Sequence, residues 1–568
     1  MAMSSNLSYM TGRQLPSARN FYSTVPEMMK HHSLDQNKVV HIYYDWETGD
    51  MEKLTYKTLY DNARKFAKGL LRLGIKKGHL VGLAGENIPE WTYAAVGLQL
   101  CGAIPLNFFF NKTDGKDVEG LLKSAGSECK AIIFPPGKSN INLAVVEKIF
   151  EEGNERGEVV SETLPSIKLA VILKMHYESE RYLDMESVIA NVVDQTEFPA
   201  LDPDDIATIF MTSGSLGIPK LVQHSHRNIL IFGHQVRECL GSEAEKIFND
   251  RSFCWIVGFL AWESYTGKTR VIIRNVTSIP SMQVYHDVVK KIVLAENCHS
   301  VIMIIPLLQE ILNRGTFDWR IPKIVTAGQP VPSTLATLTG KACDCFSVLY
   351  GCTEIGCIAE KVAYKPEDFM DYEVGDPVQG VEVKVVDREG NVVECDEEGE
   401  LYVRSQIRFL GYLNNETKSH AVNSKSGWYK TDDSVKMMKT GRFIVNGRMK
   451  DSIAKVGPRF VSLAAIEIQL KKHPGISDVI VFSYIDELHY HCVCCAIISK
   501  ENTMLSKAEL DEYLLDKAHR TEANLMQKLE LPRSYAFLKA FPRTFSGKVD
   551  RRQVAEMSKQ VLFEHSNQ

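Results

Sequence analysis

Residues 210–226, "FMTSGSLGIPKLVQHSH", place hydroxyl and glycine residues directly before a single lysine, Lys220. One interpretation is an ordinary surface turn, because Gly, Ser and Pro favour turns anywhere. The other is a phosphate cradle, because backbone N–H groups of a glycine-rich loop can wrap phosphate oxygens beside a lysine. The rest of the chain decides between the two.

Two common phosphate loops do not fit this stretch. A Walker loop has Lys directly after its last Gly and then Ser or Thr, whereas two residues separate Gly217 from Lys220. A dinucleotide fingerprint needs G-x-G-x-x-G before a helix, and the spacing of Gly214, Gly217 and Gly233 does not provide it.

The elements that would hold such a loop alternate between strands and helices. The pattern predicts a helix that ends near Gly74, a strand at 79–84, a helix with Pro89 in its first turn, and a strand at 103–108. The apolar residues at helical spacing in the first helix are Leu59, Ala63, Phe66, Ala67 and Leu70. This alternation is typical of a mostly parallel sheet covered by helices.

Six further strands are predicted, several of which end in Gly, Thr or Ser, where ligands of open α/β sheets bind. They are 130–134, 168–174, 205–211, 300–306, 322–328 and 346–351. After Gly380 the pattern changes to an antiparallel hairpin over 381–405. We therefore expect an α/β fold: a large N-terminal multi-sheet α/β domain with a β-rich subdomain (1–449), and a small mobile α+β C-terminal domain (450–568).

Composition excludes some classes of protein. The 568 residues are 44% hydrophobic and 24% charged, which argues against disorder, and the net charge of -5 leaves no basic excess to neutralise a nucleic-acid backbone. Thirteen cysteines show no metal-ligand or disulfide spacing, so Cys492, Cys494 and Cys495 are interpreted as small core residues in a reducing compartment. No apolar run approaches the roughly 20 residues of a membrane helix.

The loop before Lys220 resembles the "TSGSTGxPK" signature of the adenylate-forming (AMP-binding) superfamily, which contains acyl-CoA synthetases, luciferases and peptide-synthetase adenylation domains. Six more stretches resemble motifs of that superfamily in the same order: "TAGQPVP" (326–332), "YGCTE" (350–354), "GELYVRSQIRFLGYLNNET" (399–417), "GWYKTDD" (427–433), "GRMKDSIAKVG" (447–457) and "PRTFSGKVDRR" (542–552). Chance agreement of seven ordered motifs is negligible. The sequence is therefore identified as a member, and it is most similar to animal medium-chain and related fatty acyl-CoA ligases.

The resemblance implies a two-step ligase reaction with ATP, Mg²⁺ and CoA. A carboxylate attacks the α-phosphate of ATP, pyrophosphate leaves, and the CoA thiol displaces AMP from the acyl-adenylate. Both steps build negative charge, so catalysis needs cations and preorganised donors. The motifs assign catalysis to Lys548, Thr353, Glu354 and Lys220, and the Mg²⁺ contacts to Thr353 and Glu354, whose oxygens suit a hard cation.

The implied nucleotide site is larger, and Asp433 would hold the ribose hydroxyls with Arg448 nearby. It comprises Thr212, Ser213, Gly214, Ser215, Gly217, Lys220, Gly328, Gln329, Pro330, Tyr350, Gly351, Thr353, Asp433 and Arg448. Lys548 would reach the reacting carboxylate, Lys450 would be the hinge between domains, and Gly457 is assigned to the CoA site.

Trp255, Gly258 and Gly351 are assigned to the acyl pocket, although a core tryptophan explains Trp255 equally well. Four departures from the motifs stand out: Leu216 replaces a hydroxyl residue, Gln329 replaces Ala, Asp432 replaces Gly, and Ala454 replaces Lys. Because the recognised lysines and carboxylates are present, we favour an active, divergent enzyme.

Two alternatives stay open: an aryl-CoA ligase or luciferase-like adenylating enzyme, and a catalytically silent relative that acts as a binding protein. The family's initial "SY" aligns with Ser8 and Tyr9, which leaves little room for a presequence and favours the cytoplasm. The N-terminal stretch has no acidic residue before Glu27, so a mitochondrial location is the alternative. Chain length of the substrate and oligomeric state are not determined by the sequence.

Overall fold

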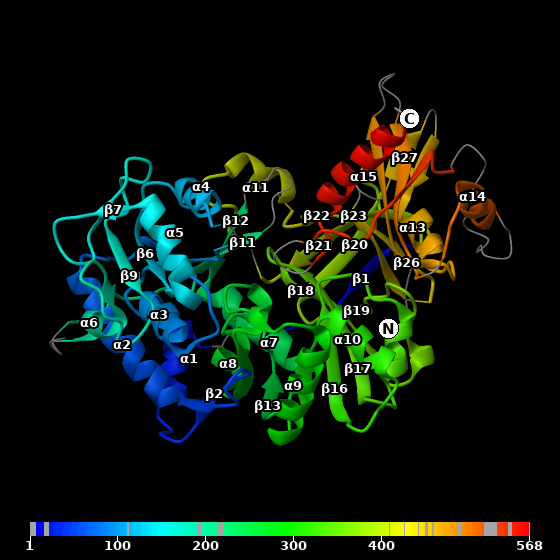
Figure 1. Cartoon of the computed structure of the whole chain (residues 1–568). Coiled ribbons are helices and arrows are strands. Elements are labelled where there is room, and N and C mark those ends of the chain that lie inside the picture. The colour runs from blue at the N-terminus through cyan, green and yellow to red at the C-terminus, as the bar shows by residue number, and fades with distance from the viewer. Residues whose placement is uncertain are drawn as a thin grey trace. The chain divides into compact units, whose positions relative to one another are not determined.

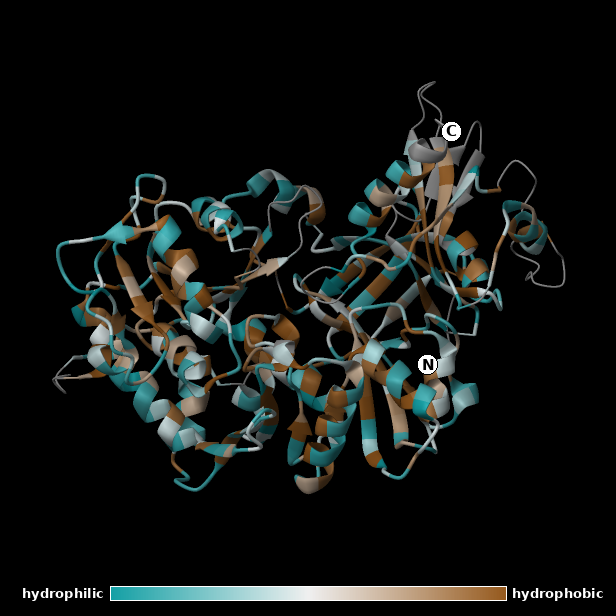
Figure 2. Cartoon of the chain, viewed as in Figure 1, coloured by the Kyte–Doolittle hydropathy of each residue, from teal (hydrophilic) through white to brown (hydrophobic). Residues whose placement is uncertain are grey.

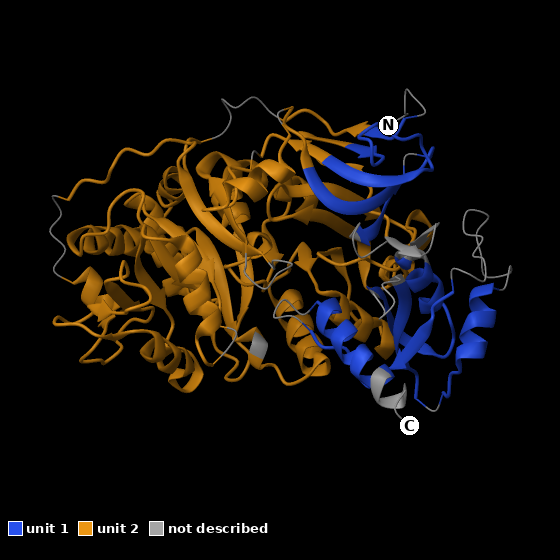
Figure 3. Ribbon diagram, turned by 90° about the horizontal axis from the view of Figure 1, so that it is seen from above, with its two compact units in different colours: residues 1–9, 384–402, 430–568 blue, residues 10–383, 403–429 orange. Residues whose placement is uncertain are grey.

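The computed structural model describes residues 7–15, 22–110, 113–190, 196–212, 220–407, 409–424, 426–440, 442–448, 453–456, 459–485, 491–501, 503–515, 531–543 and 548–566. The chain divides into two units, coloured separately in Figure 3. The larger unit is Met10–Val383 with Val403–Tyr429, and the smaller unit is Met1–Tyr9, Lys384–Tyr402 and Lys430–Gln568. The domain boundary predicted between residues 449 and 450 lies outside the described residues and stays a prediction.

A seven-stranded sheet forms the first half of the larger unit (Figure 1). Its order is β10-β9-β6-β4-β5-β11-β12, and every pair is parallel except β11 with β12. The strands are β4 (Leu80–Ala84), β5 (Ile104–Phe108), β6 (Cys129–Phe134), β9 (Leu169–Ile172), β10 (Leu183–Asp184), β11 (Ile206–Thr212) and β12 (Lys220–Ser225). β4 and β5 are buried along their whole length, as expected for parallel strands covered on both faces.

The helices that accompany this sheet include the two that the sequence predicts, one that ends near Gly74 and one with Pro89 in its first turn. They are α1 (Val25–His32), α2 (Tyr56–Arg72), α3 (Pro89–Leu100), α4 (Lys116–Ala125), α5 (Ile141–Ile149) and α6 (Met185–Ile189), with a small β7 (Glu151–Glu152) and β8 (Val159–Val160) hairpin. All five apolar residues predicted for α2 are buried, the Thr55 hydroxyl caps its first turn, and Gly74 follows its end with φ 86°. Pro89 lies in the first turn of α3.

A nine-stranded sheet forms the second half, in the order β19-β18-β17-β16-β15-β13-β14-β2-β3. Its strands are β2 (Val39–Asp45), β3 (Met51–Thr55), β13 (Lys246–Phe248), β14 (Thr269–Arg274), β15 (Ser300–Ile302), β16 (Ile321–Ala327), β17 (Cys343–Cys352), β18 (Gly356–Ala363) and β19 (Asp376–Pro377). Its helices are α7 (His226–Leu240), α8 (Ala261–Thr266), α9 (Met282–Ala295) and α10 (Ile305–Arg314). The strand predicted over 300–306 is shorter than expected, because Pro306 lies in the first turn of α10.

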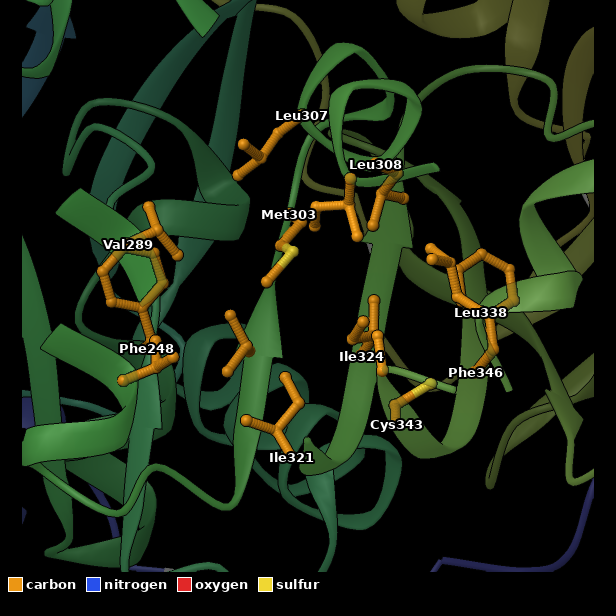
Figure 4. Close-up of a cluster of buried hydrophobic side chains, with 14 of the residues drawn as sticks. Phe248, Val289, Met303, Leu307, Leu308, Ile321, Ile324, Leu338, Cys343 and Phe346 are labelled. Atoms are coloured by element: carbon orange, nitrogen blue, oxygen red, sulfur yellow. The ribbon is translucent and has the colours of Figure 1, made fainter. Parts of the chain in front are cut away.

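Each large sheet has its own hydrophobic core. Figure 4 shows the nine-stranded sheet's cluster, in which Phe248, Ile324 and Phe346 are fully buried against residues of α9 and α10. In the seven-stranded sheet the equivalent residues include Leu106, Ile132 and Phe134. Figure 2 shows hydrophobic residues concentrated on these strands and hydrophilic residues in the loops.

The hairpin predicted over 381–405 contains neighbouring strands of a five-stranded sheet, ordered β1-β20-β21-β22-β23. These strands are β1 (Tyr9–Thr11), β20 (Val381–Val386), β21 (Glu398–Ser405), β22 (Tyr429–Met437) and β23 (Phe443–Arg448). α11 (Glu416–Val422) belongs to the larger unit.

The rest of the smaller unit is α+β, as predicted. It contains β24 (Ile453–Val456), β25 (Arg459–Ser462), α13 (Leu463–Lys471), β26 (Ile476–Ile485), β27 (His491–Ser499), α14 (Lys507–Leu515), β28 (Ser534–Phe537) and α15 (Arg551–Ser566). Cys494 and Cys495 are fully buried in the two clusters on either side of β27, which confirms their interpretation as core residues. All thirteen cysteines are free thiols, and all except Cys345 and Cys352 are buried.

Candidate active site

Lys220 is the first residue of β12, and its cross-strand partner on β11 is Thr212. The predicted phosphate loop therefore joins two antiparallel strands whose ends are held side by side. Its central residues Ser213, Gly214, Ser215 and Gly217 lie outside the described residues. The structure thus fixes both ends of the loop, and the loop's own contacts stay a prediction.

A segment distant in sequence pairs with the other edge of β12. The Leu413 N–H donates to the Leu221 carbonyl at 2.9 Å, and Tyr412 forms an antiparallel bridge with Val222. Gly411 has a φ of 117°, in the region that favours glycine, which explains the Gly of the "GY" motif directly before Tyr412. Two motifs that are far apart in the chain are therefore neighbours in the larger unit.

Tyr412 links Lys220 to Glu354. Lys220 Nζ donates to the Tyr412 hydroxyl at 3.3 Å and lies 4.9 Å from the centroid of its ring. The same hydroxyl donates to Glu354 Oε1 at 2.8 Å. Burial, followed by the charge of Glu354, raises the pKa of Tyr412 far above its ordinary value, so the phenol stays protonated and can donate.

Glu354 lies in the tight turn between β17 and β18, where Cys352 and Gly356 are paired. A Cβ on Gly351 would come within 2.2 Å of the Gly356 carbonyl oxygen, so the turn requires glycine at position 351. Gly356 has a φ of 79°, which also favours glycine. The turn presents Thr353 half-buried and Glu354 with only 6% of its surface exposed.

His224 supports this turn from β12. Its Nε2 lies 2.7 Å from the Thr353 carbonyl oxygen, which can only accept, so Nε2 carries the proton. Burial lowers the pKa of His224 to about 4, although the Thr353 carbonyl and Glu354 act in the opposite direction. His224 is therefore neutral at pH 7 and orients the backbone beside Glu354.

The predicted adenine segment follows β16 at the same sheet edge as the "YG" motif. β16 and β17 are parallel and pair Ala327 with Leu349, so Gly328 and Tyr350 come next on adjacent strands. Gly328 has a φ of 84° and is exposed, as is Pro330. The side chains of Gln329 and Tyr350 are half-buried. This edge is where ligands bind in parallel sheets.

The segment assigned to the acyl pocket follows β13. Trp255 is half-buried, with its ring 5.4 Å from that of Phe109 beyond β5. Gly258 is buried, and a Cβ there would lie 2.0 Å from the Ser252 carbonyl oxygen, so its close packing requires glycine. The guanidinium of Arg270 holds the segment from behind by donating to the carbonyls of Asn249, Arg251 and Gly258.

In the smaller unit, Asp433 and Arg448 are cross-strand partners on β22 and β23. Asp432 is exposed and has a φ of 60°, the left-handed region, which explains why the family's motif has Gly there. Burial raises the pKa of Glu400, with Lys430 acting against this and the charge of Asp432 adding to it. Asp433 is half-buried with its N–H donated to Thr431 Oγ1 at 3.0 Å.

The remaining predicted residues divide into described and undescribed positions. Lys548 is described and exposed, whereas Lys450 and Gly457 lie outside the described residues.

The sequence analysis did not identify Tyr412 or His224 as site residues, although both lie next to motif residues, in "LGYLNN" and "LVQHSH". The sequence feature that could have identified them is a polar side chain beside a motif residue. That feature alone does not distinguish a site residue from a core residue.

Within the described part of the chain, no cluster of three His, Cys, Asp or Glu side chains could hold a metal ion. None of the helices there is long and apolar enough to cross a membrane. A cation at this site would therefore depend on oxygens supplied by its ligand as well as by Thr353 and Glu354.

Comparison with known proteins identifies the class to which this fold and site belong. The AMP-binding enzyme family matches residues 31–413. The chain belongs to this family of AMP-binding enzymes, within the adenylate-forming superfamily of acyl- and aryl-CoA ligases.

Relatives match across most of the chain. The putative acyl-CoA synthetase YngI of Bacillus subtilis is 25% identical over 532 residues, 91% of this chain and 94% of its own. The mitochondrial medium-chain acyl-CoA ligase ACSF2 of Bos taurus is 25% identical over 90% of this chain and 84% of its own.

Solved structures confirm the predicted multi-sheet α/β fold. The ATP-bound RpMatB-BxBclM chimera B1 has a TM-score of 0.76 and 17% identity over 95% of this chain and 100% of its own. The o-succinylbenzoate CoA synthetase MenE of Bacillus subtilis, in complex with ATP and magnesium ion, has a TM-score of 0.72 and 20% identity over 94% and 99% of the two chains.

Proposed function

We propose that this protein is an ATP-dependent acid–thiol ligase, which converts a carboxylic acid to an acyl-adenylate with release of pyrophosphate and then transfers the acyl group to CoA. The observation that carries the proposal is the Lys220–Tyr412–Glu354 contact, which joins three separate family motifs at one place. A cation and a buried carboxylate held beside a phosphate-type loop suit phosphate chemistry.

Lys220 has the role of holding the phosphates of ATP. It is the first residue of β12, and the loop after Thr212 would supply backbone N–H groups around the same oxygens. When the carboxylate attacks the α-phosphate, negative charge grows on the phosphate oxygens, and the ammonium is already placed to stabilise it. The leaving pyrophosphate is held by the same groups.

Glu354 and Thr353 would hold Mg²⁺ that arrives with the nucleotide. Their oxygens fit a hard cation, and Mg²⁺ commonly binds through one or two carboxylates plus substrate phosphates. The ion would neutralise phosphate charge when bound. His224 keeps the Thr353 backbone in place for this purpose, because it is neutral and donates to the Thr353 carbonyl.

The other assignments rest on the motifs. Asp433 binds the ribose hydroxyls with Arg448 beside it on the neighbouring strand, and Lys548 approaches the reacting carboxylate during adenylation. Lys450 is the hinge and Gly457 contacts CoA. The 1–449 and 450–568 domains would alternate between the two half-reactions.

A medium-chain fatty acid is the proposed substrate, placed between Trp255 and Gly351. The names of the Bos taurus and Bacillus subtilis relatives support an acyl chain. Trp255 is half-buried and packs against the buried Phe109, and the two rings supply an apolar surface for such a chain. The cytoplasm is the proposed location.

The test is exchange of pyrophosphate into ATP with a panel of fatty, aryl and amino acids, in the wild type and in Lys220→Ala. Exchange with medium-chain fatty acids supports the proposal, and exchange with aromatic acids alone would move the function to an aryl-CoA ligase. Removing one charge-stabilising group typically lowers turnover by roughly a hundredfold or more, so we expect that loss in Lys220→Ala.

Lys246→Ala is the matched control. Lys246 also begins a strand, β13, and bonds to Glu296 at 2.9 Å. We expect wild-type exchange from it. An unchanged ATP requirement in Lys220→Ala would show that the loop is an ordinary surface turn. If the wild type shows no exchange with any acid, the result would favour a catalytically silent relative.

A further inference from the structure

Lys220 and Glu354 carry opposite charges in one small region, yet no ion pair joins them among the described residues. The Tyr412 phenol lies between them instead, 3.3 Å from Lys220 Nζ and 2.8 Å from Glu354 Oε1. A half-buried ammonium and a buried carboxylate attract each other at short range. Their separation therefore needs a physical cause.

The hydroxyl of Tyr412 bonds to both charged groups. It accepts from Lys220 Nζ and donates its proton to Glu354 Oε1. Because a phenol has a single proton, that proton is committed to the Glu354 carboxylate while an oxygen lone pair is committed to the ammonium.

The ring of Tyr412 is held as firmly as its hydroxyl. Only 4% of the residue is exposed, and the ring packs edge-on against Phe409 with centroids 4.7 Å apart. Its backbone bridges to Val222, and its N–H donates to Ser419 Oγ at 2.8 Å. A side chain fixed in this way can act as a spacer.

The spacer leaves binding capacity on both charged groups. Lys220 uses one of its three N–H donors on Tyr412, and Glu354 uses Oε1, so the remaining donors and Oε2 can serve a ligand. A direct Lys220–Glu354 pair would neutralise both groups. Any phosphate or cation would then have to break that pair in order to bind.

We propose that Tyr412 is a positioning residue of the adenylation site: its phenol keeps Lys220 and Glu354 apart, so that the ammonium is available to phosphate and the carboxylate to Mg²⁺. This inference rests on the proposed function. The loss of the spacer affects substrate and transition state equally, because the competing ion pair must be broken for both. The predicted defect is therefore in KM for MgATP, with kcat little changed.

The experiment measures MgATP binding by calorimetry and pyrophosphate exchange in Tyr412→Phe, which keeps the ring but removes the hydroxyl. We expect Kd and KM for MgATP to rise roughly tenfold while kcat changes less than about threefold. In the Glu354→Gln background no ion pair can form, so adding Tyr412→Phe should weaken MgATP binding by less than about twofold.

Tyr265→Phe is the matched control, because Tyr265 is a half-buried tyrosine whose hydroxyl also bonds to an ionisable side chain, His234 Nδ1 at 2.9 Å. It should bind MgATP like the wild type. The spacer role is overturned if Tyr412→Phe binds MgATP normally, or if its defect is the same in the Glu354→Gln background. A wild type that binds no MgATP would overturn the proposed function itself.

Discussion

Replacing His224 by Gln tests whether this histidine is a neutral donor to the Thr353 carbonyl. Burial lowers the pKa of His224 from 6.5 to about 4. A histidine with a lowered folded pKa takes up its proton more readily after unfolding. Its contribution to stability is therefore fully present above pH 6.5 and is lost as the pH falls toward 4.

The magnitude follows from these two values of the pKa. At pH 5 the unfolded histidine is about 97% protonated and the folded one about 9%, so protonation favours unfolding by ~2 kcal/mol relative to pH 8. Gln cannot titrate, and its amide N–H₂ can still donate to the Thr353 carbonyl. Between pH 8 and pH 5 the wild type should therefore lose ~2 kcal/mol more of its free energy of unfolding than the variant does.

Two measurements check this. Urea unfolding at both pH values gives the difference, in which other titrating groups cancel. Hydrogen–deuterium exchange at the imidazole C2 position, followed by mass spectrometry, gives the pKa of His224 directly. An exchange midpoint near pH 6.5, or a difference in unfolding free energy that is constant from pH 8 to pH 5, would refute the reasoning.

A second buried histidine, His226, serves as a control that distinguishes an effect on stability from an effect on activity. Burial also lowers its pKa to about 4, but its Nδ1 accepts from the Val25 N–H, away from the Thr353 turn. His226→Gln should therefore show a similar pH-dependent change in stability and retain wild-type exchange. His224→Leu, which leaves the Thr353 carbonyl unpaired, should lose about 1–3 kcal/mol of stability and should also lose activity.

Two further predictions concern the smaller unit. Lys548→Ala should abolish formation of the adenylate yet retain thioester formation from synthetic acyl-AMP and CoA, measured as separate half-reactions; an equal loss in both would contradict domain alternation. Asp432→Gly should change the apparent affinity for ATP by less than about tenfold, because Asp432 is exposed, whereas Asp433→Ala should weaken binding clearly more. Nucleotide titration distinguishes the two, and a large gain of activity in Asp432→Gly would favour a chain that has lost ATP chemistry.

Much of the fold could be predicted because local patterns decide it. The helical spacing of Leu59, Ala63 and Phe66 predicted α2, and the apolar run that follows His79 predicted β4. The strand at 300–306 was overextended, because an apolar run alone does not show where Pro306 starts a helix.

The candidate site was predictable in its residue types but not in its connections. The motifs identified Lys220 and Glu354, and the glycine expected at position 432 proved to match a left-handed backbone. The Tyr412 bridge was not predictable, because 192 residues separate Tyr412 from Lys220 and only the sheet pairing beside β12 brings them together. Local sequence carries no information about such distant contacts.

Buried cysteines in three separate hydrophobic cores can report when each core opens to solvent. Burial raises the pKa of Cys129, in the seven-stranded core, to about 12, and that of Cys343, in the nine-stranded core, to about 12. Burial also raises the pKa of Cys495, in the smaller unit, well above its ordinary range. Only thiolates react quickly with alkylating agents, so each cysteine becomes reactive when its own core opens. Timed alkylation followed by peptide mass analysis would therefore report three opening rates from one unmodified protein.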